Sequence, residues 1–244
     1  LDGVTGVQTC ALPIYAGAYS YRDRNQNEKG IIWAVQRRWK KQMELSGVVE
    51  LYRSLDRTYT SLFPIQAAVF QLRLSYRSLE GMGQLRENRT YSSAEWREIT
   101  QRDGYCRITL NWRLTSHDQW LARIEYKRIS QENQKILDGW LISLRHTRNL
   151  KKYELVTQLI GFDTEGYDAR IYIYCKELPG LWSVPAFYGH GVHGYLMPSY
   201  RTKKWSIAFK AAFTFYPSLR ALTDGRNGHW FQDYGLYIQK KLEW

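Results

Sequence analysis

The sequence predicts an all-β protein, specifically an antiparallel up-and-down β-barrel that spans a membrane. About twelve segments alternate apolar and polar side chains, which is the period of a strand whose two faces meet different surroundings. These segments cluster near roughly ten residues, the length that a tilted strand needs to cross a bilayer, whereas strands of soluble proteins average about five or six. Tryptophan and tyrosine lie toward the ends of the apolar faces, as in the aromatic girdles of membrane barrels.

The bulk composition limits the classes of protein but does not choose among them. The chain has 244 residues, a formal net charge of +12, 19 tyrosines and 10 tryptophans. A run of about 18 apolar residues, which a membrane-spanning helix would need, does not occur. The basic balance fits three partners: nucleic acid, an anionic membrane surface or an acidic solute.

The first fourteen residues do not fit the rest of the chain. Residues 1–14 lack the alternation of apolar and polar side chains seen in the other segments, and they also lack the basic start of a secretory signal. They resemble the translated read-through of a sequencing adapter, so we expect them to be a non-native artefact. We therefore expect residues 15–244 to be the C-terminal portion of a larger barrel. Cys10 lies in the expected artefact and has no role in the predicted fold.

The first half of the chain predicts hairpins. The polar stretch 79–103 is either a surface loop or contains one strand near 92–100. The clearest hairpin spans residues 105–126 with a tight turn at 116–118. The expected strands are 31–39, 43–51, 68–76, 106–114 and 120–126.

The second half continues the same alternation. Residues 178–191 are irregular and contain Pro179-Gly180 and Pro185. The turns at 116–118 and 148–151 are expected to lie on the same side of the membrane as the turn at 201–204 only if residues 182–188 form a further strand. The expected strands are 140–145, 153–161, 169–175, 192–200, 205–215 and 236–244.

The apolar stripes are expected to face lipid. The chain ends on an aromatic residue of an alternating strand, and Leu242 with Trp244 resembles the C-terminal signal that barrel-insertion machinery recognises. Outer-membrane lipid and that machinery are therefore expected partners. The expected lipid-facing and girdle residues are Trp112, Trp120, Trp140, Trp205, Phe209 and Phe213.

The opposite faces are rich in basic side chains. Charges that point into a wet lumen cost little, whereas each would cost about 2–4 kcal/mol on the lipid face at the middle of the membrane. Such a lumen would favour an anionic solute or would hold acidic residues of a plug by ion pairs. The expected lumen-facing residues are Arg107, Arg113, Arg123, Lys127, Arg145, Arg170 and Lys210.

Two stretches resemble a known family. DARIYIY at 168–174 and SVPAFYGHG at 183–191 are similar to the C-terminal barrel of Bacteroidetes outer-membrane proteins termed helix-hairpin-helix domain-containing. The resemblance covers about residues 30–244, with these two stretches as its specific part. It implies an N-terminal helix-hairpin-helix module, a binder of DNA backbone, that is missing from this chain.

Other chemistry is weakly indicated. His190 and His193 are three apart and so point to opposite faces of a strand. Asp163, Glu165 and Asp168 lack the spacing of a calcium loop and fit ordinary turn chemistry. No nucleophile motif or phosphate loop occurs, so the sequence predicts no metal site, no cofactor and no enzyme.

The sequence therefore predicts a bacterial outer-membrane barrel, pore-like or transport-like, with a basic lumen or plug. One alternative is an envelope anchor that holds the missing nucleic-acid-binding module. A second alternative is a soluble basic β protein that binds nucleic acid itself.

Overall fold

A computed structural model describes residues 28–39, 42–54, 66–92, 97–132, 134–218 and 227–240. The strands are long, 11 to 17 residues, apart from two short ones. They are β1 (Glu28–Trp39), β2 (Met43–Ser54), β3 (Gln66–Tyr76), β4 (Leu79–Ser92), β5 (Arg97–Arg113), β6 (Asp118–Gln131), β7 (Leu137–Leu150), β8 (Tyr153–Thr164), β9 (Ile171–Tyr172), β10 (Ala186–Phe187), β11 (His190–Arg201), β12 (Trp205–Ser218) and β13 (Asn227–Lys240).

The fold is all-β, antiparallel and up-and-down. The long strands form one 11-stranded sheet in the order β1-β2-β3-β4-β5-β6-β7-β8-β11-β12-β13, and β9 pairs only with β10. Within the described residues, β1 and β13 each have a partner on one side, so the described sheet ends at these two strands. No helix in the described part of the chain is long and apolar enough to cross a membrane.

The chain divides into two compact units. Unit 1 comprises residues 1–106 and 128–136, and unit 2 comprises residues 107–127 and 137–244. Strands β5 and β6 contribute residues to both units.

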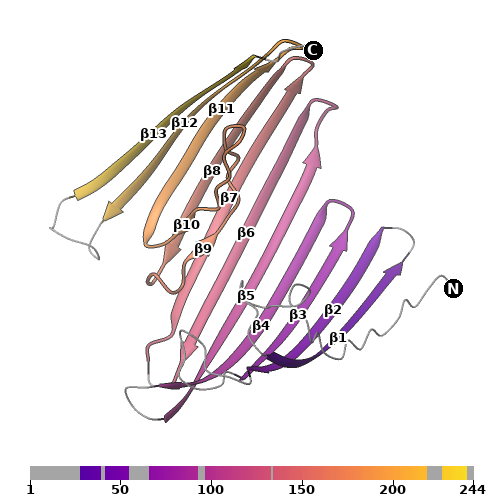
Figure 1. Ribbon diagram of the computed structural model, residues 1–244, viewed down its shortest axis with the longest axis vertical. Coiled ribbons are helices and arrows are strands. Elements are labelled where there is room, and N and C mark those ends of the chain that lie inside the picture. Colours follow the sequence, from indigo (N-terminus) through magenta and orange to yellow (C-terminus); the bar gives the residue numbers. More distant parts are fainter. Residues whose placement is uncertain are drawn as a thin grey trace. The chain divides into compact units, whose positions relative to one another are not determined.

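In unit 1, strands β1 to β4 lie side by side with alternating faces (Figure 1). One pairing row joins Trp33, Val49, Phe70 and Leu85, and the next row toward the turns joins Val35 with Gly47, Leu72 and Gly83. The apolar members of these rows are mostly exposed, with Phe70 at 46% and Leu85 at 63%. Ala67 and Val69 on the other face of β3 are buried.

In unit 2, the strands β7, β8, β11, β12 and β13 are neighbours (Figure 1), and the side chains on their two faces differ sharply in exposure. We call one the bare face; its members are exposed or half-exposed and include Trp140, Ile142, Leu144, Leu159, Leu196, Trp205 and Phe209. The other is the covered face; its members are buried and include Leu141, Ser143, Val156, Gln158, Ile160, Phe162, Tyr195, Met197, Ala208, Lys210 and Ala212.

The connection between β8 and β11, residues 165–189, lies on the covered face. We call this connection the crossing segment. The expected strand at 169–175 is wrong: β8 pairs directly with β11 over eleven residue pairs, from His190↔Asp163 to Tyr200↔Tyr153. No place in the sheet remains for another strand between them. The apolar side of the segment is buried against the face of the sheet instead, and only Ile171 and Tyr172 form a short ladder with β10.

Two other expectations about strands need correction. The polar stretch at 79–92 is strand β4, so the strand precedes the expected position at 92–100. Strand β13 begins at Asn227, nine residues before the expected start of the last strand at 236. In both cases glycine and polar residues suggested turns, although the partner strand supplies the hydrogen bonds that such residues need.

The direct pairing of β8 with β11 also decides the side on which the turns lie. The whole stretch 165–189 is one connection between antiparallel neighbours. The turns after β5, β7 and β11 therefore lie at the same end of their strands, although residues 182–188 do not form a strand of the sheet.

Candidate functional site

The crossing segment packs on the covered face through a period-two apolar side. Ala169, Ile171, Ile173 and Cys175 are each at most 2% exposed. They join a core with sheet residues such as Leu141, Ile160 and Phe162. Because fully burying a large aliphatic side chain contributes about 1.5–3 kcal/mol, these contacts hold the segment firmly on the sheet.

Two glycines let the segment approach the sheet closely. A Cβ atom at Gly139 would lie 2.6 Å from the carbonyl oxygen of Ala169. A Cβ atom at Gly235 would lie 2.5 Å from Leu178 Cδ1. The segment therefore lies directly on backbone at β7 and β13, and a side chain at Gly139 would collide with its main chain.

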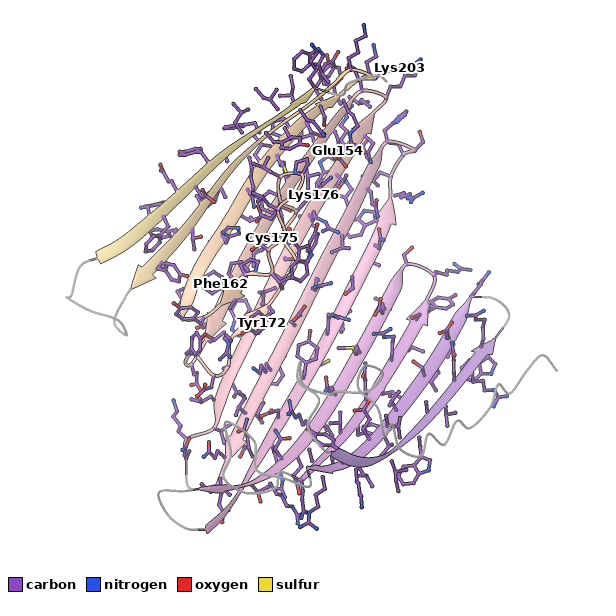
Figure 2. The ribbon with its side chains drawn as sticks, viewed as in Figure 1. Glu154, Phe162, Tyr172, Cys175, Lys176 and Lys203 are labelled. Atoms are coloured by element: carbon purple, nitrogen blue, oxygen red, sulfur yellow. The ribbon has the colours of Figure 1, made fainter. Side chains whose placement is uncertain are left out.

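Two ion pairs fix the far part of the segment. Lys210 Nζ on β12 lies 2.6 Å from Glu177 Oε1, and their side chains are only 8% and 18% exposed. Lys176 Nζ lies 2.6 Å from Glu154 Oε2 on β8. Figure 2 shows Lys176 and Glu154 close together where the segment crosses the strands. The low exposure makes the Lys210 pair the more costly one to break.

A third lysine holds the near part of the segment. Lys127 Nζ on β6 donates to the carbonyl oxygens of Asp168 at 2.9 Å and Arg170 at 3.3 Å. Arg170 then lies over the ring of Tyr167, 4.1 Å from its centroid, and its Nε donates to Tyr172 Oη at 2.6 Å. That hydrogen bond is the main reason why the pKa of Arg170 is raised.

Buried hydroxyl and thiol groups lie in the middle of the interface. Tyr195 Oη accepts from the backbone N–H of Lys176 at 3.0 Å and donates to Gln158 Oε1 at 2.9 Å. Cys175 belongs to the same buried core as Tyr195, and burial raises the pKa of its thiol to about 11. A thiol of this kind is protonated and inert at neutral pH, so it packs as a small apolar group.

The basic residues expected on one face reach different surroundings. Lys127 and Lys210 contact the crossing segment, and Arg123 lies 3.3 Å from the buried carboxylate of Glu125. Arg145 alternates with the bare-face Leu144, whereas Arg113 is exposed at the end of β5. Arg107 is half-buried on β5. Arg170 is part of the crossing segment and not of the sheet, which corrects its expected place on a strand.

The expected aromatic residues lie on the bare face or stack at its edge. Trp140, Trp205 and Phe209 are exposed there, and Phe213 lies in the row of Leu144 and Leu159. Trp112 and Trp120 stack with ring centroids 6.3 Å apart. Leu242 and Trp244 lie outside the described residues.

The acidic turn does not form a metal site in the described residues. Asp163 lies 3.7 Å from His190, Glu165 accepts from the backbone N–H of Asp138, and Asp168 lies 3.9 Å from Arg170. The three carboxylates therefore have separate partners. Within the described ranges no group of three or more His, Cys, Asp or Glu residues could hold a metal ion.

Sequence reasoning missed Glu177, Glu154, Lys176 and Tyr195, which carry the contacts of the crossing segment. The only signal in the sequence was the excess of basic residues on the expected inward faces, which implies acidic partners elsewhere in the chain. No family model matches the chain, and no curated protein is significantly similar to it.

Proposed function

We propose that this chain forms the membrane-spanning part of a bacterial outer-membrane β-barrel protein. In this proposal the bare face of unit 2 and the exposed apolar face of unit 1 contact lipid, and the crossing segment acts as a plug. The bare face of unit 2 carries the proposal. Its positions from Tyr153 to Gly161, Val192 to Tyr200, Ile207 to Phe215 and Trp230 to Ile238 include no Asp, Glu, Lys or Arg.

The length of that uncharged band fits a bilayer. It covers nine residues of each of the strands β8, β11, β12 and β13, from Tyr153 to Gly161 on β8, and about nine to eleven residues span a membrane when a strand is tilted. Soluble proteins rarely expose an apolar patch larger than a few hundred Å². Antiparallel strands of this kind cross the outer membrane of bacteria as closed barrels.

The contacts of the crossing segment favour a plug over an open basic channel. Lys210 is neutralised by Glu177, and Lys127 donates to two carbonyl oxygens of the segment, so both ammonium groups are already bound to it. We therefore propose that passage of an anionic solute requires the segment to move. The insertion machinery of the outer membrane and its lipid are the proposed partners.

Extraction tests the membrane assignment. Membranes from cells that express the chain are washed at alkaline pH and with urea, without detergent. The protein is expected to stay in the pellet and to dissolve only in detergent. Release by the washes would contradict the proposal.

Conductance tests the plug. The chain in a planar bilayer is expected to show rare, small openings, and Lys210→Met is expected to open more often because it removes the buried cation that binds Glu177. Large, steady conductance of the unaltered chain would contradict a plug.

A further inference from the structure

The turn end of unit 2 carries a dense cluster of cations. The two windows 148–154 and 200–206 surround the β7–β8 and β11–β12 turns. Their basic side chains are all exposed and are Arg148, Lys151, Lys152, Arg201, Lys203 and Lys204. Figure 2 shows Lys203 at this end of the strands.

Carboxylates barely offset this charge. Glu154 is the one acidic residue of the two windows, and it is already bound by Lys176 at 2.6 Å. Of the six cations, Arg148 alone approaches a carboxylate in the described residues, lying 3.8 Å from Asp118. The opposite end of unit 2 is acidic, with Asp138, Asp163, Glu165 and Asp168. These six cations are thus gathered at one end of unit 2 with few carboxylates among them, whereas charges of both signs are mixed on an ordinary solvated surface.

The two turns are tied together. The backbone N–H of Arg201 donates to the carbonyl oxygen of Lys152 at 2.7 Å. The β11–β12 turn is itself held closed, because Thr202 Oγ1 accepts from the backbone N–H of Trp205 at 2.9 Å. These bonds keep the cations of neighbouring turns side by side, so one anion can meet several of them.

Aromatic side chains border the cations on the bare face. The rings of Tyr153 and Tyr200 lie 4.8 Å apart, and Lys240 Nζ lies 5.8 Å from the ring centroid of Trp205. Tyr and Trp favour the depth at which lipid headgroups meet acyl chains. Side chains just beyond such a belt are therefore at the level of the lipid phosphates.

We infer that this basic end binds the phosphate groups of anionic phospholipids, with the acyl chains against the adjoining bare face. The inference rests on the proposed membrane function. Lysine and arginine donate charge-assisted hydrogen bonds to phosphate oxygens, and clusters of basic residues next to a membrane select anionic lipids. A nucleic acid fits less well, because the surface that adjoins the cations is apolar and suits an acyl chain.

Lipid selectivity tests the inference. The full chain is first inserted into phosphatidylcholine vesicles, and spin-labelled phosphatidylglycerol and phosphatidylcholine are then compared for association with it. The unaltered chain is expected to prefer phosphatidylglycerol, and the preference is expected to fall when NaCl rises from about 0.1 to about 1 M.

Variants locate the site. Lys203→Gln/Lys204→Gln is expected to lose about tenfold or more of the preference, since each cation near an anionic surface contributes roughly fivefold. Lys29→Gln/Arg53→Gln removes the same number of charges. Lys29 and Arg53 pair at the ends of β1 and β2 that are remote from the β1–β2 turn, so this variant is expected to keep the preference for phosphatidylglycerol.

Each failure has a distinct meaning. A chain that does not insert into phosphatidylcholine overturns the proposed function and the inference with it. A chain that inserts but shows no lipid preference, or an equal loss in both variants, overturns the inference alone. Complete competition by inorganic phosphate at constant ionic strength, or by a short DNA duplex, would also overturn the lipid assignment.

Discussion

At the residue scale, Lys210–Glu177 is the more buried of the two ion pairs described between the sheet and the crossing segment. Both side chains are largely removed from water and their charged atoms are 2.6 Å apart. Lys210 also lies 5.0 Å from the ring centroid of Tyr195, so the aromatic ring shares in stabilising its charge. Removing one partner leaves a buried charge without compensation.

The pair can be measured by a double-mutant cycle. Lys210→Met is expected to lower the free energy of unfolding by about 3–5 kcal/mol, because Glu177 then lies buried and unpaired. Lys210→Met/Glu177→Gln is expected to recover part of that loss, because the orphaned charge is gone. Urea unfolding of the unaltered chain, of Lys210→Met, of Glu177→Gln and of the double variant gives the four values, and strictly additive losses would contradict a direct pair.

Cys175 reports directly on whether the segment is docked. The pKa of its thiol is about 11 in place of 9.0, so below pH 9 the folded chain holds roughly a hundredfold less thiolate than the unfolded chain. In a Cys10→Ser/Cys106→Ser background, alkylation is therefore expected to be at least that much slower in the folded chain than in urea.

The sign of the pH effect follows from the same shift. A raised pKa means that the unfolded chain releases this proton first as pH rises from 9 to 11. The contribution of Cys175 to stability is therefore complete below pH 9 and is lost toward pH 11. A Cys175→Ala variant should lack this part of the alkaline decline in unfolding free energy, and an identical decline would contradict the assignment.

At the element scale, the crossing segment and a strand have the same sequence pattern. Residues 169–175 alternate apolar and polar side chains as a lipid-facing strand does, yet their apolar side meets the covered face of the sheet. Alternation identifies an extended segment with two different surroundings, and it does not say whether backbone partners are available. The close approach at Gly139 and Gly235 is the physical difference, and it appears only when distant strands are brought together.

A valine at Gly139 should loosen the segment. Gly139→Val puts its Cβ against the carbonyl of Ala169, and overpacking of this kind costs about 1–3 kcal/mol. Limited trypsin digestion is expected to cut faster after Arg170 and Lys176. Gly161→Val is the matched control, since a Cβ there meets nothing within 4 Å, and equal cleavage of both variants would contradict the packing.

Much of the strand pattern was predictable from the sequence, and the reasons for the errors are specific. The hairpin at 105–126 and the stripes at 140–145, 153–161 and 205–215 were confirmed because their period is regular and their turns are short. Strand β4 was missed because Gly81 and Gly83 resemble a turn, although they occupy open positions of a paired strand. The ion pairs of Lys210 and Lys176 join residues that are distant in sequence, so no local pattern indicates them. The anchoring role for a nucleic-acid-binding module stays a prediction.

At the scale of the whole molecule, the proposed function depends on whether the bare face of unit 2 meets lipid or water. A charge in place of an exposed leucine lowers stability strongly where the leucine faces lipid and changes it little where the leucine faces water. The centre of the uncharged band in unit 2 is the row of Thr157, Leu196 and Ala211. A charge placed in that row therefore distinguishes the two surroundings.

Leu196→Arg provides this test. In a bilayer it is expected to lower the free energy of unfolding by about 2–4 kcal/mol. In water, a substitution at this 44% exposed side chain would change stability by only about 0.5 kcal/mol. Leu114→Arg is the control, because Leu114 is 67% exposed and lies in the turn after β5. Equal, small effects in lipid vesicles would contradict a membrane barrel.

The connection between β8 and β11 also has a kinetic consequence. The other connections that the structure describes in unit 2 are tight turns, whereas residues 165–189 make a link of 25 residues between paired strands. Closing a longer loop costs more chain entropy before any pairing is gained, and contacts of this kind form late. The hairpins of β7 with β8 and of β11 with β12 are therefore expected to form before β8 pairs with β11. Before β8 and β11 pair, the apolar side of residues 169–175 has no surface to cover it. We expect this partly paired chain to be the species that most needs a chaperone.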